Sequence, residues 1–334
     1  MHLVNLNAVA LKMKRYLQFF VILGIFIVFS CQEKDKTEVA INAIPVNLEV
    51  VRFDDEFANA KPEAIPILKN SFPYLFPEQV PDSVWIMKLT DTLQLELKAE
   101  IDKAFPNFKT QEKELITLFK HIKYYVPNYE VPKVVTLVSE VQYDARVVLT
   151  DSLLLIGLDN YLGPEHKFYA GMSNYIAKAL NKDYMMADVA GAFAKTINKF
   201  PRNRTFLSRM VYYGKELWIK DKLLPKATDA EKIGFTPEEM AWAKANEEQM
   251  WRYFIEQELL YSTASELDRR FLDPAPFSKF RLELDNETPG RLGRYMGWQI
   301  VRAYAKNNPE VSLMELLDMP SDELFKKSNY KPKK

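Results

Sequence analysis

The stretch 131–138 reads VPKVVTLV, and two similar runs follow it, ARVVL at 145–149 and SLLLIG at 152–157. Each run is rich in β-branched and aliphatic residues and is bounded by turn-forming residues, a pattern that predicts strands. In most of the remaining chain, apolar residues recur with helical spacing instead. These three runs therefore predict a small central sheet inside a mainly helical protein.

Helices are predicted on both sides of these runs. The clearest case is Leu93, Leu97, Ile101 and Phe105, which are four residues apart and form one stripe on a helix. A strand is also predicted at 46–50, with short helical turns and loops from 53 to 76. The predicted helices are 92–105, 111–125, 168–180, 185–198, 206–223, 237–261 and 289–305, with short ones at 313–317 and 321–326. This order predicts one α+β domain, predominantly helical, over residues 43–334.

The segment before this domain has the layout of a bacterial lipoprotein signal. An almost unbroken apolar run at 16–30 follows the basic residues Lys12, Lys14 and Arg15 and ends at Cys31, the single cysteine of the chain. We expect residues 1–30 to be a signal peptide, Cys31 to carry the lipid, and 31–42 to be a tether. The alternative is an uncleaved spanning helix, but the run is shorter than the roughly 20 residues that spanning requires.

This interpretation predicts a location in the cell envelope. Acyl chains on Cys31 would anchor the protein to the inner or outer membrane. A domain facing the periplasm is favoured over one on the cell surface.

Composition excludes several classes of function. The chain has 45 basic and 45 acidic residues, so nothing indicates a nucleic-acid partner. With one cysteine, an intramolecular disulfide and a cysteine-based zinc or redox site are excluded. No cofactor is expected.

Several longer phrases resemble one known family. They are IGLDNYLG at 156–163, MVYYGKEL at 210–217, TPGRLGRYMGWQIV at 288–301 and YKP at 330–332. Together with the lipoprotein signal, they resemble the gliding motility lipoprotein GldB family of the Bacteroidetes. The resemblance implies an envelope lipoprotein required for gliding, a movement whose adhesins are exported by type IX secretion. It implies no established biochemical activity.

The same layout is similar, at greater distance, to zinc peptidases of the gluzincin kind. Those enzymes use His-Glu-x-x-His on one helix and a downstream glutamate as the third zinc ligand. Here the corresponding helix reads DVAGAFAK at 188–195, and Tyr213 stands where a glutamate is expected before Gly214. The three histidines, His2, His121 and His166, do not supply the motif. We therefore expect a degenerate zincin-like fold, a pseudo-metallopeptidase without a metal site.

A cleft could survive in such a fold. Arginine and tyrosine side chains suit peptide or glycan contact. The candidate cleft residues are Arg209, Tyr213, Lys215 and Glu216 on one predicted helix and Arg291, Arg294 and Tyr295 on another. The alternative is that they are ordinary residues of amphipathic helices.

Three functions are consistent with these observations. The first is a non-enzymatic binding or assembly component that contacts other gliding or secretion proteins of the envelope. The second is a hydrolase with unconventional ligands, such as Asp188, Glu216 and His166. The third is a peptide- or glycan-binding module that uses the cleft.

Overall fold

The computed structural model describes residues 36–283 and 285–332. Contacts between residues divide the chain after Pro45 into two units. The helix α2 (Lys36–Asn42) belongs to the first unit, so part of the predicted tether is helical. The second unit starts at Val46 and contains the sheet and the helices from α3 to α17.

The sheet has four strands in the order β1-β2-β4-β3. They are β1 (Val50–Arg52), β2 (Lys133–Leu137), β3 (Val147–Leu149) and β4 (Leu153–Gly157). The strands β1, β2 and β4 are parallel, and β3 pairs with β4 in the antiparallel direction at the edge. The three predicted strand runs are confirmed. The strand predicted at 46–50 is displaced, because pairing with β2 begins only at Val50.

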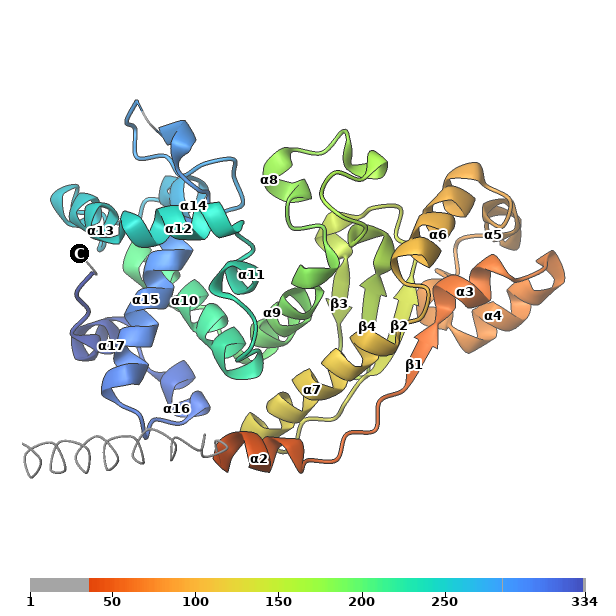
Figure 1. Cartoon of the computed structure of the whole chain (residues 1–334), viewed down its shortest axis with the longest axis horizontal. Helices are drawn as coiled ribbons and strands as arrows, with labels where there is room; N and C mark the ends of the chain where they lie inside the picture. The colour runs from red at the N-terminus through yellow and green to blue at the C-terminus, as the bar shows by residue number, and fades with distance from the viewer. Residues whose placement is uncertain (1–35, 284, 333–334) are drawn as a thin grey trace, which may run out of the picture. The chain divides into compact units, whose positions relative to one another are not determined.

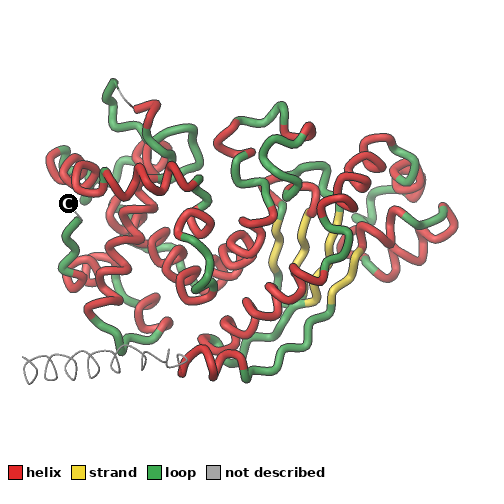
Figure 2. The backbone as a smooth tube through the Cα atoms, in the orientation of Figure 1, coloured by secondary structure: helices red, strands yellow, loops and turns green. Residues whose placement is uncertain are grey.

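Helices cover both faces of this sheet (Figures 1 and 2). Val134, Leu154 and Ile156 point to one face and belong to the main core, with residues of α7 (Lys109–Tyr125) and α9 (Met185–Ile197). The alternate residues Val135 and Leu155 face a smaller core of phenylalanines. That core lies mainly under α3 (Phe53–Ala58) and α4 (Ile65–Ser71). Both faces are therefore buried, as parallel strands require.

The remaining helices complete a predominantly helical α+β domain, as predicted. They are α5 (Asp82–Lys88), α6 (Thr92–Ala104), α8 (Asn174–Ala177), α10 (Phe206–Leu223), α11 (Asp229–Ile233), α12 (Pro237–Ala245), α13 (Glu247–Glu256), α14 (Glu266–Phe271), α15 (Leu292–Asn307), α16 (Leu313–Asp318) and α17 (Ser321–Ser328).

Two of the predicted long helices are wrong. The segment 237–261 contains α12 and α13, which are separated at Asn246, where the amide side chain donates to the carbonyl of Trp242 at 2.9 Å. The segment 168–180 contains only a short turn and α8, because Ser173 is extended. Tyr169 and Leu180 pack in a small core of their own and need no continuous helix.

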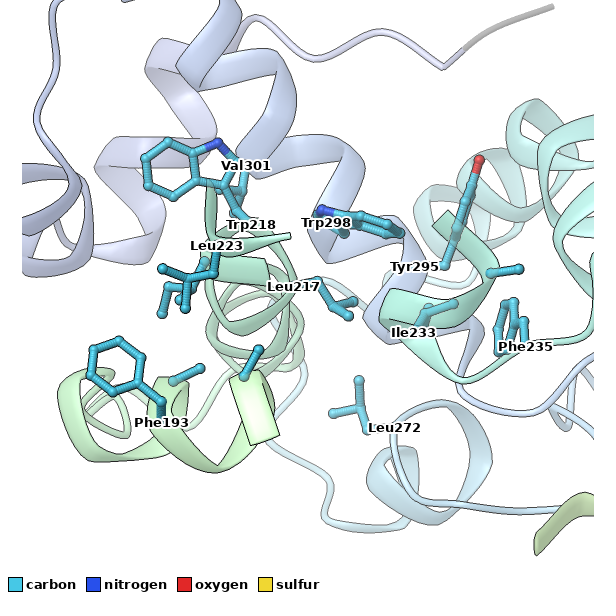
Figure 3. Packing of buried hydrophobic residues seen from close by; sticks show 14 of the residues in the cluster. Phe193, Leu217, Trp218, Leu223, Ile233, Phe235, Leu272, Tyr295, Trp298 and Val301 are labelled. Carbon is cyan, nitrogen blue, oxygen red and sulfur yellow. The ribbon is translucent and has the colours of Figure 1, made fainter. Parts of the chain in front are cut away.

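The helices α10 and α15 form the centre of the C-terminal half. Each contributes a glycine at their contact, and a Cβ on Gly214 or Gly297 would overlap the backbone of the other helix. This close approach buries Trp298 and Tyr295 of α15 almost completely. Figure 3 shows the Trp298 ring near Leu217 of α10 and the Tyr295 ring on the side of Ile233 and Phe235. The contact fixes how the two helices present their other side chains.

Candidate functional site

A cavity of about 310 Å³ lies where α9, α10 and the start of α15 meet the sheet edge at β3. Figure 1 shows α9, α10 and α11 next to one another in this part of the fold. Four of the seven predicted cleft residues line the cavity: Tyr213, Glu216, Arg291 and Arg294. The two helices that carry the predicted residues therefore do contribute to one shared cavity.

The helix α9 supplies one wall of the cavity. Asp188, Gly191, Ala192 and Lys195 line it, because positions three and four apart share a helix face. The guanidinium of Arg146, next to β3, donates to both oxygens of Asp188 at 2.6 and 2.8 Å. Although burial opposes it, this carboxylate raises the pKa of Arg146. The two charges neutralise each other inside the wall.

The helix α10 supplies the facing wall with Tyr213, Glu216 and Lys220. Glu216 is only 8% exposed and has no hydrogen bond or ion pair among residues 36–283 and 285–332. The ammonium of Lys220 donates to the carbonyl of Lys232 at 2.9 Å. Burial lowers the pKa of Lys220. This wall therefore presents a carboxylate and an ammonium that do not pair with each other.

Gly191 keeps the space between these two helices open. A Cβ at this position would lie 3.1 Å from the Nζ of Lys220 and 3.7 Å from an oxygen of Glu216. The glycine therefore leaves room in front of both charged groups.

The start of α15 brings two arginines to the cavity. Arg291 has a left-handed backbone (φ 60°) and donates to the carbonyl of Gly234 at 2.8 Å. Arg294 donates through Nε to the carbonyl of Leu272, and its guanidinium carbon lies 3.8 Å from the centre of the Tyr213 ring. Burial and the nearby charge of Arg294 lower the pKa of Arg291 to about 10. Neither arginine has an ion-pair partner in the described part of the chain.

The other three predicted residues lie outside the cavity lining. Arg209 is 3.0 Å from a carboxylate oxygen of Asp268. Lys215 donates to the carbonyls of Leu317 and Met319 at 2.9 and 2.7 Å, and burial lowers its pKa to about 8.

Tyr295 completes this group. Its hydroxyl donates to Glu247 at 2.8 Å. Burial beside this carboxylate raises the pKa of Tyr295. The contacts of all three residues are those of structural side chains.

The ligand set considered for a hydrolase is not assembled. Asp188 and Glu216 line the cavity, but His166 does not, and its Nε2 lies 3.4 Å from Glu100. His121 is buried, with Nδ1 2.9 Å from the carbonyl of Thr117. Within the described residues, no group of three His, Cys, Asp or Glu side chains could hold a metal ion.

Sequence analysis missed four cations of the cavity, Arg146, Lys195, Lys220 and Lys232. Lys220 could have been found, because it follows Glu216 by four residues and shares its helix face. Lys215 directly precedes Glu216 in the sequence, so it lies on a different face of the helix and does not point into the cavity. Arg146 gave no such signal, because it reaches Asp188 only through the pairing of β3 with the rest of the sheet.

Two observations bear on the membrane. The lipid attachment predicted at Cys31 falls outside the described residues. Across 36–283 and 285–332, none of the helices is long and apolar enough to cross a bilayer.

Comparison with known proteins identifies a family. Neither the curated proteins nor the solved structures contain a match to the chain. The model of the family "Gliding motility protein GldB", whose short label marks it as a family of lipoproteins, matches residues 34–332. This match covers almost the whole described chain and supports involvement in gliding motility. The chain belongs to the GldB family of gliding motility proteins.

Proposed function

We propose that this protein is a non-catalytic binding component of the gliding machinery, anchored in the envelope by lipid on Cys31. The family supports a role in gliding. The sequence at 12–31 supports the anchor, and a link to type IX secretion extends the family resemblance. The partners would be other envelope proteins of gliding or secretion.

The observation that carries the binding role is the lining of the cavity. Under the distant similarity to gluzincins, the metal ligands would come from the helix at 188–195 and from position 213. Asp188, Ala192 and Tyr213 do line one cavity, which supports a zincin-like arrangement. Their chemistry is different, because Asp188 is already bound by Arg146 and the other two are alanine and tyrosine. A cavity with this lining is suited to binding rather than to metal-assisted hydrolysis.

The test combines two variants in gliding cells. Cys31→Ser should release the protein from the membrane fraction and abolish gliding. Gly191→Leu should fill the cavity and reduce gliding while the protein stays in the membrane fraction. The matched control is Gly171→Leu, since Gly171 is exposed and a Cβ there meets nothing within 4 Å.

Each part can be contradicted separately. A Cys31→Ser protein that resists extraction from membranes by carbonate would contradict the anchor. A Gly191→Leu protein that melts like the wild type and supports normal gliding would contradict a role for the cavity. Stoichiometric zinc in the purified protein, measured by elemental analysis, would contradict the non-catalytic role.

A further inference from the structure

The charges that line the cavity do not balance. Arg146 is paired with Asp188, and Lys232 is paired with Asp221 at 3.0 Å. Glu231 is engaged by the backbone N–H of Thr228 in the cap of α11. Beyond these, the exposed Asp144 and Lys195 lie on the lining without ion-pair partners in the described chain.

The inner part of the cavity holds the imbalance. Lys220, Arg291 and Arg294 have no carboxylate within ion-pair distance in the described segments, and Glu216 is the single buried acid beside them. Three cations therefore face one carboxylate.

Such an arrangement is unfavourable without a ligand. Moving a cation out of water is expensive, and buried charges are normally paired. Burial lowers the pKa of Lys220 and of Arg291, and the charge of Arg294 lowers that of Arg291 further. Glu216 and Asp188 only partly offset the effect of burial on the pKa of Lys220. An anion in the cavity would reverse both shifts, because it favours the charged form of each group.

The donors are already held in place. Arg291 is fixed by the carbonyl of Gly234, and Arg294 is fixed by the carbonyl of Leu272 and by the Tyr213 ring. The two terminal nitrogens of Arg294 make no hydrogen bond to any described residue and are free to donate. A guanidinium fork held in this way binds the planar or tetrahedral oxygens of an anion without a large loss of side-chain entropy.

We propose that this cavity is an oxyanion-binding site, in which Lys220, Arg291 and Arg294 hold a carboxylate or phosphate group of the partner. This inference rests on the proposed function, since it names the chemistry that the cavity recognises. The volume of about 310 Å³ suits a small group or a chain end. Glu216 accepts a hydrogen bond from a hydroxyl or N–H next to the oxyanion.

The test is isothermal titration calorimetry on the full chain purified in detergent. The probes are inorganic phosphate, the peptide acetyl-Ala-Ala with a free carboxylate, and the same peptide as its amide. We expect saturable 1:1 binding of phosphate, of the free peptide, or of both, and none of the amide. Phosphate alone identifies a phosphate group as the ligand, and the free peptide alone identifies a carboxylate. No binding of either anion, or equal binding of the amide, overturns the proposal.

Three variants assign the binding to this cavity. Arg294→Gln should weaken binding by at least about tenfold, because a charge-assisted hydrogen bond contributes about 1.5 to 3 kcal/mol. Glu216→Gln should strengthen phosphate binding, because it removes the negative charge beside the site. The matched control Arg269→Gln, at an exposed arginine outside the cavity, should leave binding unchanged.

The two variants Arg294→Gln and Glu216→Gln are expected to change the affinity in opposite directions, which separates a local charge effect from a loss of folding. Partial unfolding weakens binding in any variant, whereas only local charge explains a gain in Glu216→Gln. Equal affinities in Arg294→Gln and Arg269→Gln, with wild-type melting curves, would overturn the proposal. The calorimetry does not depend on Cys31, so a negative binding result would not contradict the proposed lipid anchor. Likewise, a failed anchor would leave the oxyanion site intact.

Discussion

Arg294 and Arg302 lie on the same helix, α15, and each stacks on an aromatic ring. The guanidinium carbon of Arg302 is 3.6 Å from the ring centre of Trp298, and that of Arg294 is 3.8 Å from the ring centre of Tyr213. Arg302 also binds two carboxylates, Asp221 and Asp229, at 2.7 Å each. Within the part of the chain that the structure describes, the one side-chain hydrogen bond of Arg294 goes to a backbone carbonyl, that of Leu272. Two similar stacked arginines therefore differ in whether the protein itself supplies their anion.

This difference separates the packed side of α15 from its cavity side. On the packed side, although burial raises it, the hydrogen bond and charge of Arg302 lower the pKa of Asp229 to about 2. The charged groups there form ion pairs with one another within the fold. On the cavity side, Arg291 and Arg294 are held by backbone carbonyls and have no carboxylate within ion-pair distance among the described residues. We infer that the packed side serves stability and that the cavity side serves binding.

The largest expected effect comes from replacing one glycine of the packed side, Gly297, and one glycine of the cavity wall, Gly191, by alanine. In Gly297→Ala, the new Cβ would overlap the carbonyl of Met210, and backbone cannot move aside as a side chain can. We expect a loss of about 3 kcal/mol in the free energy of unfolding, measured by urea denaturation. In Gly191→Ala, the Cβ meets the flexible end of Lys220. Helix propensity should then leave stability unchanged or raise it by up to about 1 kcal/mol.

The two alanine variants control for each other, since both replace a glycine inside a helix. Equal losses in both would show that the cavity is as tightly packed as the contact between α10 and α15. That outcome would remove the distinction between the two sides.

The second expected effect compares the arginines directly. Arg302→Gln leaves Asp221 and Asp229 without their main partner, so the free energy of unfolding should fall by about 2 to 3 kcal/mol. This is below the range for a fully buried pair, because the Arg302 side chain is 28% exposed. Arg294→Gln removes no carboxylate partner and should change stability by less than about 1 kcal/mol. Denaturation of both variants under the same conditions checks the difference, and a larger loss in Arg294→Gln would reverse our assignment of the two sides.

Sequence patterns predicted most of the fold because burial follows local periodicity. The run at 206–223 coincides with α10, since one helix face must enter the core. The helices predicted at 168–180 and 237–261 are longer than the observed ones, because periodicity does not show where the backbone breaks. Apolar spacing continues through Ser173 and Asn246, where the backbone leaves the helix.

The site was predicted less completely, because it depends on contacts between distant segments. Tyr213 and Glu216 could be chosen from the family phrase at 210–217, yet Lys215 in the same phrase donates to carbonyls at the C-terminal end of α16. Arg146 joins the cavity only through sheet pairing. Residue type alone cannot show which of two arginines on α15 already has a carboxylate.

The smallest expected effect concerns Lys215, a packed cation that donates to two carbonyls. It has no carboxylate within ion-pair distance among residues 36–283 and 285–332. Burial lowers its pKa from 10.5 to about 8, so above pH 8 the unfolded chain binds more protons than the folded one. Stability contributed by this group must then rise with pH, by roughly 2 kcal/mol between pH 8 and pH 10. The measurement is the difference in unfolding free energy between the wild type and Lys215→Met at each pH.

Taking the difference removes the titration of the buried tyrosines, which both proteins share. A difference that stays constant from pH 8 to pH 10 would show that Lys215 titrates normally in the folded protein. Carbonyl dipoles would then satisfy a buried cation as well as a carboxylate does. In that case the cavity cations would also need no anion, because Arg291 and Arg294 already have carbonyl partners. The pH dependence of one packed lysine therefore tests the physical premise from which the oxyanion site is inferred.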